Sequence, residues 1–548
     1  MILIRKYFWN IFVSLIAITA VFMSLIGGII NYNPLPVWDM WTGYLDFYIR
    51  VLEGDHWVWL AQHNEHRIVL SRIFFWMDLH WFGGVSYFLI IVNYFLLFLV
   101  AMTFFAYLCN NECKPKNSFL SFLLLSFFFT AAFSWVQQEN LVWGFQSQFI
   151  LAQLIPLVAF YFLQYSTITK HTDQLHFSLA CLFGILAVGT MANGILALPI
   201  MIILALFLRL SNVKITILVM LSALSCTFYF FNYTSPPNHT SVLPMLLENP
   251  LGLIKYTLLY VGGPFYFLTG KLSTLLAYFF GTLLVSGAII ALFRLLNGST
   301  RTIPVKLALL AYILYVGGTA FITAGGRLEF GLEQALSSRY QTPALMAWIA
   351  LIIIYSTDIE KFTNKYKKIA PMIFSVILFG FIPSQIVALN DNSHRLHLQQ
   401  LGAVALAMGV NDNESISTLI WSKELGMTLT EKAVHYRLGI FGGPGFQFIA
   451  DNAANLEAYQ TKEIPKSCLN DKVVDEIIDD SNYTKVSWTV SCDFDFPSYN
   501  IVAIFSGSEN IQSPSGFGML AHNRGYDYRL FAYIHKNMTT ERLLVVTQ

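Results

Sequence analysis

Charged side chains are scarce in this sequence. Asp, Glu, Lys and Arg make up 12% of its 548 residues, and their formal charges nearly cancel, at +1. So few charges cannot cover one soluble core of this length, and no basic tract suggests a nucleic-acid partner. With 56% hydrophobic residues and a mean hydropathy of +0.57, the composition predicts a multi-pass protein of the lipid bilayer.

Cysteine is also scarce, with six residues and no spacing typical of a zinc site. Cys109 and Cys113 fall at an expected cytoplasmic helix end, and Cys181 and Cys226 lie inside apolar runs, where small packing residues are expected. Cys468 and Cys492 are alone in the C-terminal region. A disulfide between them is expected if that region lies in an oxidising compartment.

About eleven apolar runs are long enough for membrane helices. They lie near residues 7–30, 86–108, 118–134, 146–164, 177–190, 192–208, 214–231, 273–293, 305–323, 343–356 and 371–388. The first run is longer than the apolar core of a cleavable signal peptide, so a retained helix is expected. Basic residues concentrate in the gaps that lie on the same side of the membrane as the N-terminus. This excess predicts that the N-terminus is cytoplasmic. An odd number of spans then places the C-terminus in the periplasm, outside a bacterial inner (plasma) membrane.

The composition becomes that of a soluble domain after the last apolar run. Residues 392–408 and 430–436 are expected to be helical, whereas 486–490, 501–505 and 543–546 alternate as strands do. The sequence therefore predicts a transmembrane domain at 1–388. A small mixed α/β or β-sandwich domain is expected at 389–548.

The first gap outside the cytoplasm, residues 31–84, opens with Trp38-Asp39-Met40-Trp41. A carboxylate among tryptophans at a membrane surface is partly shielded from water, which strengthens it as a proton acceptor. Asp39 is therefore the candidate general base, and Trp38 and Trp41 are candidate sugar contacts. The alternative is an exposed acid between ordinary interfacial anchors.

The same gap continues with His63-Asn64-Glu65-His66-Arg67. If residues 61–75 form a helix on the membrane, His63 and Arg67 share one face and Glu65 and Arg72 share another, and such a face could bind a phosphate. Arg67 and His66 are candidate phosphate ligands, and Glu65 is a candidate sugar contact. The alternative is a solvated helix whose charges pair with one another. No zinc pattern is present, so no metal ligand is assigned, although a loosely held magnesium or manganese ion is an alternative.

A later gap, residues 323–341, places Arg327 beside two glycines and Arg339 beside Tyr340. Guanidinium groups bind phosphate in a bidentate manner, so both arginines are candidate ligands of a donor phosphate. The alternative is arginines that extend along the helix ends to water. Tyr340, Gln138 and Glu139 are candidate sugar contacts, although the last two could equally be polar contacts within a helix bundle.

This arrangement resembles the GT-C superfamily of membrane glycosyltransferases. The resemblance is carried by the first span, the long outside loop with the early acid Asp39, many further spans, and a C-terminal domain outside the membrane. It implies two short juxtamembrane helices in that loop and a role for Asp39 in deprotonating the acceptor. Many members carry two adjacent acids there. Met40 follows Asp39 in this chain, so the resemblance does not imply a metal.

The resemblance also implies a reaction. A polyprenyl-phosphate-linked sugar would be the donor, with its tail near residues 242–260, and a glycan or glycolipid such as lipopolysaccharide O-antigen would be the acceptor. Asp39 must then share a pocket with Arg327 and Arg339. One rival is a transporter or a lipid or glycan flippase, against which the scarcity of ionisable residues in the spans counts. A polysaccharide polymerase or ligase is another.

Overall fold

Two compact units make up the chain, and each draws on separate stretches of sequence. In the computed structural model, residues 2–110, 112–167, 172–235, 242–267, 273–297, 303–390, 393–451, 459–477, 479–480, 482–492, 500–505, 514–522, 528–536, 538 and 542–547 are described. The helical unit comprises Met1–Tyr32, Leu60–Ser71 and Leu89–Asn390. The sheet unit comprises Asn33–Trp59, Arg72–Phe88 and Asp391–Gln548.

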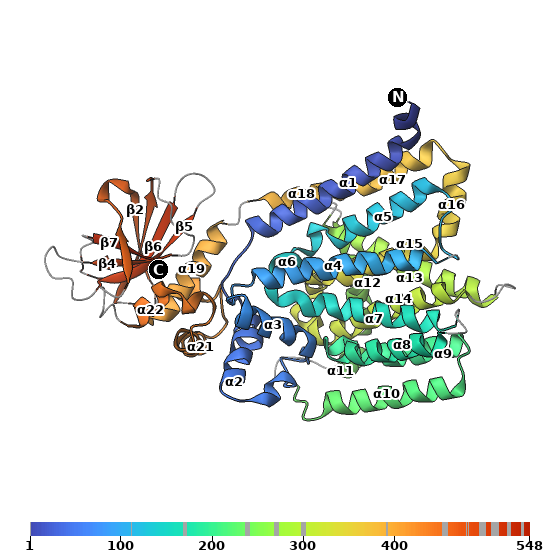
Figure 1. Cartoon of the computed structure of the whole chain (residues 1–548), viewed down its shortest axis with the longest axis horizontal. Helices are drawn as coiled ribbons and strands as arrows, with labels where there is room; N and C mark the ends of the chain where they lie inside the picture. Colours follow the sequence, from blue (N-terminus) through green and yellow to red (C-terminus); the bar gives the residue numbers. More distant parts are fainter. Residues whose placement is uncertain are drawn as a thin grey trace. The chain divides into compact units, whose positions relative to one another are not determined.

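The helical unit is built from long apolar helices joined by short turns (Figure 1). Its helices are α1 Ile2–Ile30, α4 Tyr87–Leu108, α5 Ser118–Ala132, α6 Gln138–Val142, α7 Ser147–Tyr165, α8 Asp173–Val188, α9 Ala197–Phe207, α10 Asn212–Phe230, α11 Val242–Glu248, α12 Pro250–Tyr266, α13 Ser273–Asn297, α14 Pro304–Arg327, α15 Gln341–Ile354, α16 Ser356–Lys365, α17 Ile369–Phe379 and α18 Ile382–Ile386. Large apolar side chains on α10 and α13 are exposed, as expected of helices that face lipid.

Eight helices in the described part of the chain are long and apolar enough to cross a membrane. They are Phe8–Ile30, Tyr87–Leu108, Ser118–Val142, Gly144–Tyr165, Asn212–Phe230, Ser273–Asn297, Pro304–Phe330 and Ile369–Leu389. A ninth candidate, Ser338–Ile354 with Ser356–Lys365, bends by 63° at its break. Two shorter apolar helices are Asp173–Val188 and Ala192–Phe207. The chain is therefore a helical multi-pass membrane protein.

Glycines bring α12 and α13 into backbone contact. A Cβ atom at Gly262 on α12 would overlap the carbonyl oxygen of Ala277, and one at Gly281 on α13 would overlap that of Leu258. Small residues at such crossings let membrane helices approach closely and gain van der Waals contacts. Lipid tails are as apolar as the helices, so these contacts take the place of the hydrophobic effect in holding the helices together. These two helices form a tight hairpin within the helical unit.

The sheet unit has one antiparallel sheet of seven described strands, in the order β1-β7-β4-β5-β6-β3-β2. The strands are β1 Gln460–Glu463, β2 Leu469–Glu476, β3 Tyr483–Val490, β4 Asn500–Phe505, β5 Gly516–His522, β6 Tyr528–His535 and β7 Arg542–Thr547. Its C-terminal helices are α19 Ser393–Met408, α20 Asn413–Ile416, α21 Lys423–His435 and α22 Pro444–Ala450. The predicted strands coincide with β3, β4 and β7, and the first predicted helix with α19.

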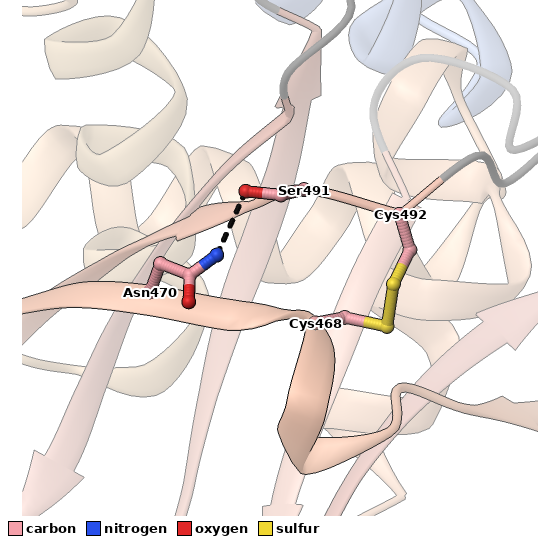
Figure 2. The surroundings of a disulfide bond; sticks show 4 residues. All are labelled: Cys468, Asn470, Ser491 and Cys492. Atoms are coloured by element: carbon pink, nitrogen blue, oxygen red, sulfur yellow. Dashed lines mark hydrogen bonds between the residues drawn. A yellow bond between two sulfur atoms is a disulfide. The ribbon is translucent and has the colours of Figure 1, made fainter.

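A disulfide joins Cys468 and Cys492 across the β2–β3 edge of the sheet, with the two Cα atoms 5.3 Å apart (Figure 2). The neighbouring residues add a hydrogen bond, because Asn470 Nδ2 donates to Ser491 Oγ at 2.9 Å. Strand β2 is polar and exposed along nearly its whole length. The covalent link therefore holds an edge strand that buries little apolar surface. The disulfide predicted from the sequence is confirmed.

Most of the first predicted loop belongs to the sheet unit. Residues 41–46 form a π-helical turn that leads into α2 (Phe47–Leu52), and α3 spans Val69–Trp81. Asn33 Nδ2 donates to Gln399 Oε1 at 2.8 Å. Glu53 forms an ion pair of 2.8 Å with Lys432 on α21. Residues of this loop therefore contact the C-terminal part of the chain within the sheet unit.

Candidate functional site

A tight turn replaces the helix expected over residues 61–75. The backbone groups of His63 and His66 exchange two hydrogen bonds, of 2.8 and 2.9 Å, and Asn64 between them has φ +48°. Asn adopts this left-handed conformation more readily than other non-glycine residues. The helix prediction is wrong for residues 61–68, since α3 begins only at Val69. His63 and Arg67 therefore do not share a helix face.

The turn presents Glu65 to an arginine at the end of α14. Arg327 Nη2 lies 2.9 Å from Glu65 Oε1, and His66 Nε2 lies 3.5 Å from the same oxygen. All three side chains are only partly exposed, at 22%, 28% and 18% for Glu65, Arg327 and His66. Partial burial strengthens the ion pair relative to one at an open surface. Three of the predicted site residues therefore meet in one cluster.

The orientation of His66 is fixed by a backbone group. The amide of Ala192, at the start of the 3-10 segment Ala192–Leu196, donates to His66 Nδ1 at 3.2 Å. A nitrogen that accepts a hydrogen bond carries no proton, so the neutral ring holds its proton on Nε2, the atom that faces Glu65. His66 in this form is a hydrogen-bond donor to the cluster rather than a free base.

Arg67 donates hydrogen bonds to backbone carbonyl groups, two of them at the end of α10. Its Nε donates to the Tyr229 carbonyl at 2.8 Å, and its Nη1 and Nη2 donate to the carbonyls of Leu60 and Phe231 at 2.5 Å each. The side chain is buried, and its guanidinium lies 5.9 Å from the Tyr229 ring centroid. Three of the five N–H groups of this guanidinium are thus directed at carbonyl oxygens.

The second predicted arginine lies in an aromatic setting. The guanidinium of Arg339 lies 5.5 Å from the Tyr340 ring centroid, and Arg339 Nε lies 4.0 Å from Glu139 Oε2. The Tyr340 ring stacks on Tyr260 of α12 at 5.0 Å. Gln138 is exposed to solvent, so only Glu139 of that predicted pair takes part in this group.

Tyr256 lies near both arginines. It is fully buried on α12, one turn before Tyr260, and its hydroxyl has no hydrogen-bond partner among the described residues. Its electrostatic neighbours include Arg327, Arg339 and Tyr340. No sequence pattern points to this residue, because a tyrosine in an apolar helix is ordinarily a packing residue. A buried hydroxyl without a partner beside two cations is the kind of group that a ligand satisfies.

An apolar cavity of about 300 Å³ is lined in part by Thr257 and Val261 of α12. Helices α9, α12, α13 and α14 line most of it, and Gly317 and Leu307 mark its extent along α14. Gly317 precedes Arg327 by ten residues, about 15 Å along the helix axis. The cavity and the arginines thus use the same two helices, α12 and α14.

The predicted base lies in the sheet unit, not in the helical unit that holds the arginines. Asp39 is partly exposed, and Trp38 beside it is 49% exposed. Trp41 is fully buried and packs on the ring of Phe441 at 5.7 Å. Its side chain therefore anchors this segment in the core of the sheet unit.

A second acid of the sheet unit is buried. Asp78 on α3 accepts hydrogen bonds at Oδ2 from the Tyr44 hydroxyl, at 2.6 Å, and from the Ser86 amide, at 3.2 Å. Burial raises the pKa of Asp78 to about 6, although both hydrogen bonds oppose the shift. Because the Tyr44 hydroxyl and the Ser86 amide already hold this carboxylate, we assign Asp78 to folding and not to a reaction.

Among the described residues, no group of three or more His, Cys, Asp and Glu side chains could hold a metal ion. Comparisons of the chain with protein-family models, with curated proteins and with solved structures find no match. The interpretation of the site therefore rests on the geometry of its own residues.

Proposed function

We propose that this chain is a GT-C-like glycosyltransferase that transfers a sugar from a polyprenyl phosphate to a glycan or glycolipid. In this proposal the eight long helices, the bent pair and the two shorter apolar helices all cross the membrane, which makes eleven spans. The N-terminus lies in the cytoplasm, and the sheet unit lies outside a bacterial inner membrane. A disulfide in the sheet unit supports this orientation, since disulfides persist in oxidising compartments.

One observation carries the proposal: Arg327 and the unsatisfied Tyr256 hydroxyl, with Arg339 near that tyrosine, lie on the two helices, α14 and α12, that also line an apolar cavity. Arg327 and Arg339 supply the charge for a phosphate, and Tyr256 supplies a neutral donor. The cavity lined in part by Thr257 supplies an apolar path for a long hydrocarbon tail. A molecule with an anionic head and a long apolar tail matches both features, as polyprenyl phosphates do.

The chemistry requires one proton acceptor and stabilisation of one leaving group. Asp39 takes the proton from an acceptor hydroxyl as its oxygen bonds to C1 of the donor sugar. The bond from C1 to the phosphate oxygen breaks with inversion, and polyprenyl phosphate leaves with one more negative charge. Arg327 and Arg339 stabilise that charge, so the leaving group needs no proton. Glu65, which is paired with Arg327, competes with the donor phosphate for that guanidinium.

The decisive test replaces Asp39 by asparagine in the full chain, reconstituted in lipid with a radiolabelled polyprenyl-phosphate sugar. Loss of a general base is expected to slow transfer by roughly 10²- to 10⁴-fold. Asp55→Asn is the matched control, because Asp55 lies in the same loop and is already paired with Arg50 at 2.5 Å. Full transfer by Asp39→Asn, with normal folding, would reject Asp39 as the base.

A further inference from the structure

Two exposed tryptophans of the sheet unit lie on chain segments that touch. Trp38 is 49% exposed and Trp421 is 77% exposed. The backbone amide of Trp38 donates to the Leu419 carbonyl at 2.5 Å, two residues before Trp421. These segments are remote in sequence, so only the folded sheet unit brings them together.

The backbone of Trp38 is held in an uncommon conformation. Its φ is +52°, a region that residues with a side chain rarely adopt. Hydrogen bonds hold it on both sides, because its amide binds Leu419 and its carbonyl accepts from the Trp41 amide at 3.1 Å. Non-glycine residues kept in this region cluster at binding sites, where the fold fixes the direction of one side chain.

The setting of Trp421 is polar. Leu419 and Ile420 are 0% and 1% exposed, so the aliphatic side chains before it point into the core. Ser422, Lys423 and Glu424 follow it at the start of α21. A surface that enters a membrane exposes aliphatic side chains together with its aromatic ones. A single indole among hydroxyl, amine and carboxylate groups instead suits a ligand with both apolar and hydroxyl-bearing faces.

We infer that Trp38 and Trp421 form the aromatic part of a glycan-binding subsite on the sheet unit. The C–H faces of a hexose pack on indole rings, and its hydroxyls find polar partners at the ring edges. Naming this glycan the acceptor rests on the proposed function, since Asp39 follows Trp38 directly. The C-terminal residues then take part in selecting the acceptor.

The test is binding of the full chain, in lipid nanodiscs, to an array of bacterial surface polysaccharides and their oligosaccharide fragments. The wild type is expected to bind at least one glycan, with a tenfold or greater loss in Trp421→Ala and Trp38→Ala. Trp421→Phe retains most of the binding, because a ring remains. Trp57→Ala, which removes a 79% exposed tryptophan of the same unit, behaves as the wild type.

Equal binding by Trp421→Ala and the wild type would overturn the inference, as would an array on which the wild type binds nothing. Brominated lipids test the alternative that Trp421 enters the membrane, because they quench the fluorescence of a tryptophan in the bilayer. Stronger quenching of the wild type than of Trp421→Phe would also overturn it. Glycan binding without sugar transfer would reject the proposed function alone, and transfer without Trp421-dependent binding would reject this inference alone.

Discussion

Glu65 and Arg327 are 262 residues apart in the sequence, and their side chains form an ion pair of 2.9 Å. The pair ties a turn of the first predicted loop to the C-terminal end of α14. An anion that binds Arg327 therefore meets the negative charge of Glu65, which already pairs with this guanidinium. If the chain binds a donor phosphate as proposed, the charge balance of this pair is expected to set the affinity for it.

Removing the guanidinium by Arg327→Ala is expected to lower sugar transfer by about 10²-fold or more, because it removes a donor to the leaving phosphate. Glu65→Gln removes the competing charge and is expected to lower the KM for the donor. Steady-state transfer with a polyprenyl-phosphate sugar measures both. Arg50→Ala, which breaks an ion pair of the sheet unit, is the control. Wild-type kinetics in Arg327→Ala would exclude it from the donor site.

Arg67 is expected to matter for stability more than for the donor. Arg67→Met leaves the carbonyls of Leu60, Tyr229 and Phe231 without this donor, and a buried carbonyl such as that of Tyr229 costs about 1–3 kcal/mol when it loses its partner. A loss of about 1–3 kcal/mol is expected in thermal unfolding in detergent. The alternative role, a phosphate ligand, predicts normal stability and a raised KM for the donor.

The cavity can be filled from one position on α14. A Cβ atom at Gly317 meets no other atom within 4 Å, and Gly317 lines the cavity. Gly317→Leu is therefore expected to fold and to raise the KM for a long-chain polyprenyl-phosphate sugar tenfold or more. A short-chain analogue should be affected little, and Gly317→Ala, which leaves most of the volume open, is the control. Equal effects on both donors would contradict a tail in this cavity.

Asp78 makes stability depend on pH. Its pKa is about 6 in the folded protein and near 4 in the unfolded chain, so the folded state binds more protons between these pH values. Stability therefore falls as pH rises from about 4 to 6, by at most about 3 kcal/mol, and then levels off. Asp78→Asn should remove this dependence in denaturant unfolding followed from pH 4 to 8. A wild-type curve that stays flat over this range would show that Asp78 remains charged.

Much of the fold follows from periodic patterns in the sequence. Long apolar runs became helices, and the alternating stretch at 501–505 became β4 (Asn500–Phe505), because burial of those side chains decides their structure locally. Strand β2 was not predicted, since its residues are polar and exposed, and its place depends on pairing with β3 and on the disulfide.

The candidate site was less predictable. Residues 61–68 carry a helix-like charge pattern, yet Arg67 binds carbonyls near the end of α10 and Glu65 binds Arg327, so distant partners override local preference. Trp41 has the composition of an interfacial anchor, but Phe441, 400 residues later, buries it. No local pattern signals Tyr256 or Trp421. Each acquires its setting only from chain segments remote in sequence.

Residues 33–59 pack in the sheet unit with residues that are synthesised much later, so they can reach their final structure only after those residues have been made. A nascent chain grows by roughly 5–20 residues each second, so this segment precedes residues 391–548 by some tens of seconds. Through that interval Trp41 lacks the Phe441 ring that buries it, and Glu53 lacks Lys432. This loop must therefore wait for the helical segments that follow residue 390, and a chain truncated after Asn390 would leave Trp41 and Glu53 without these partners.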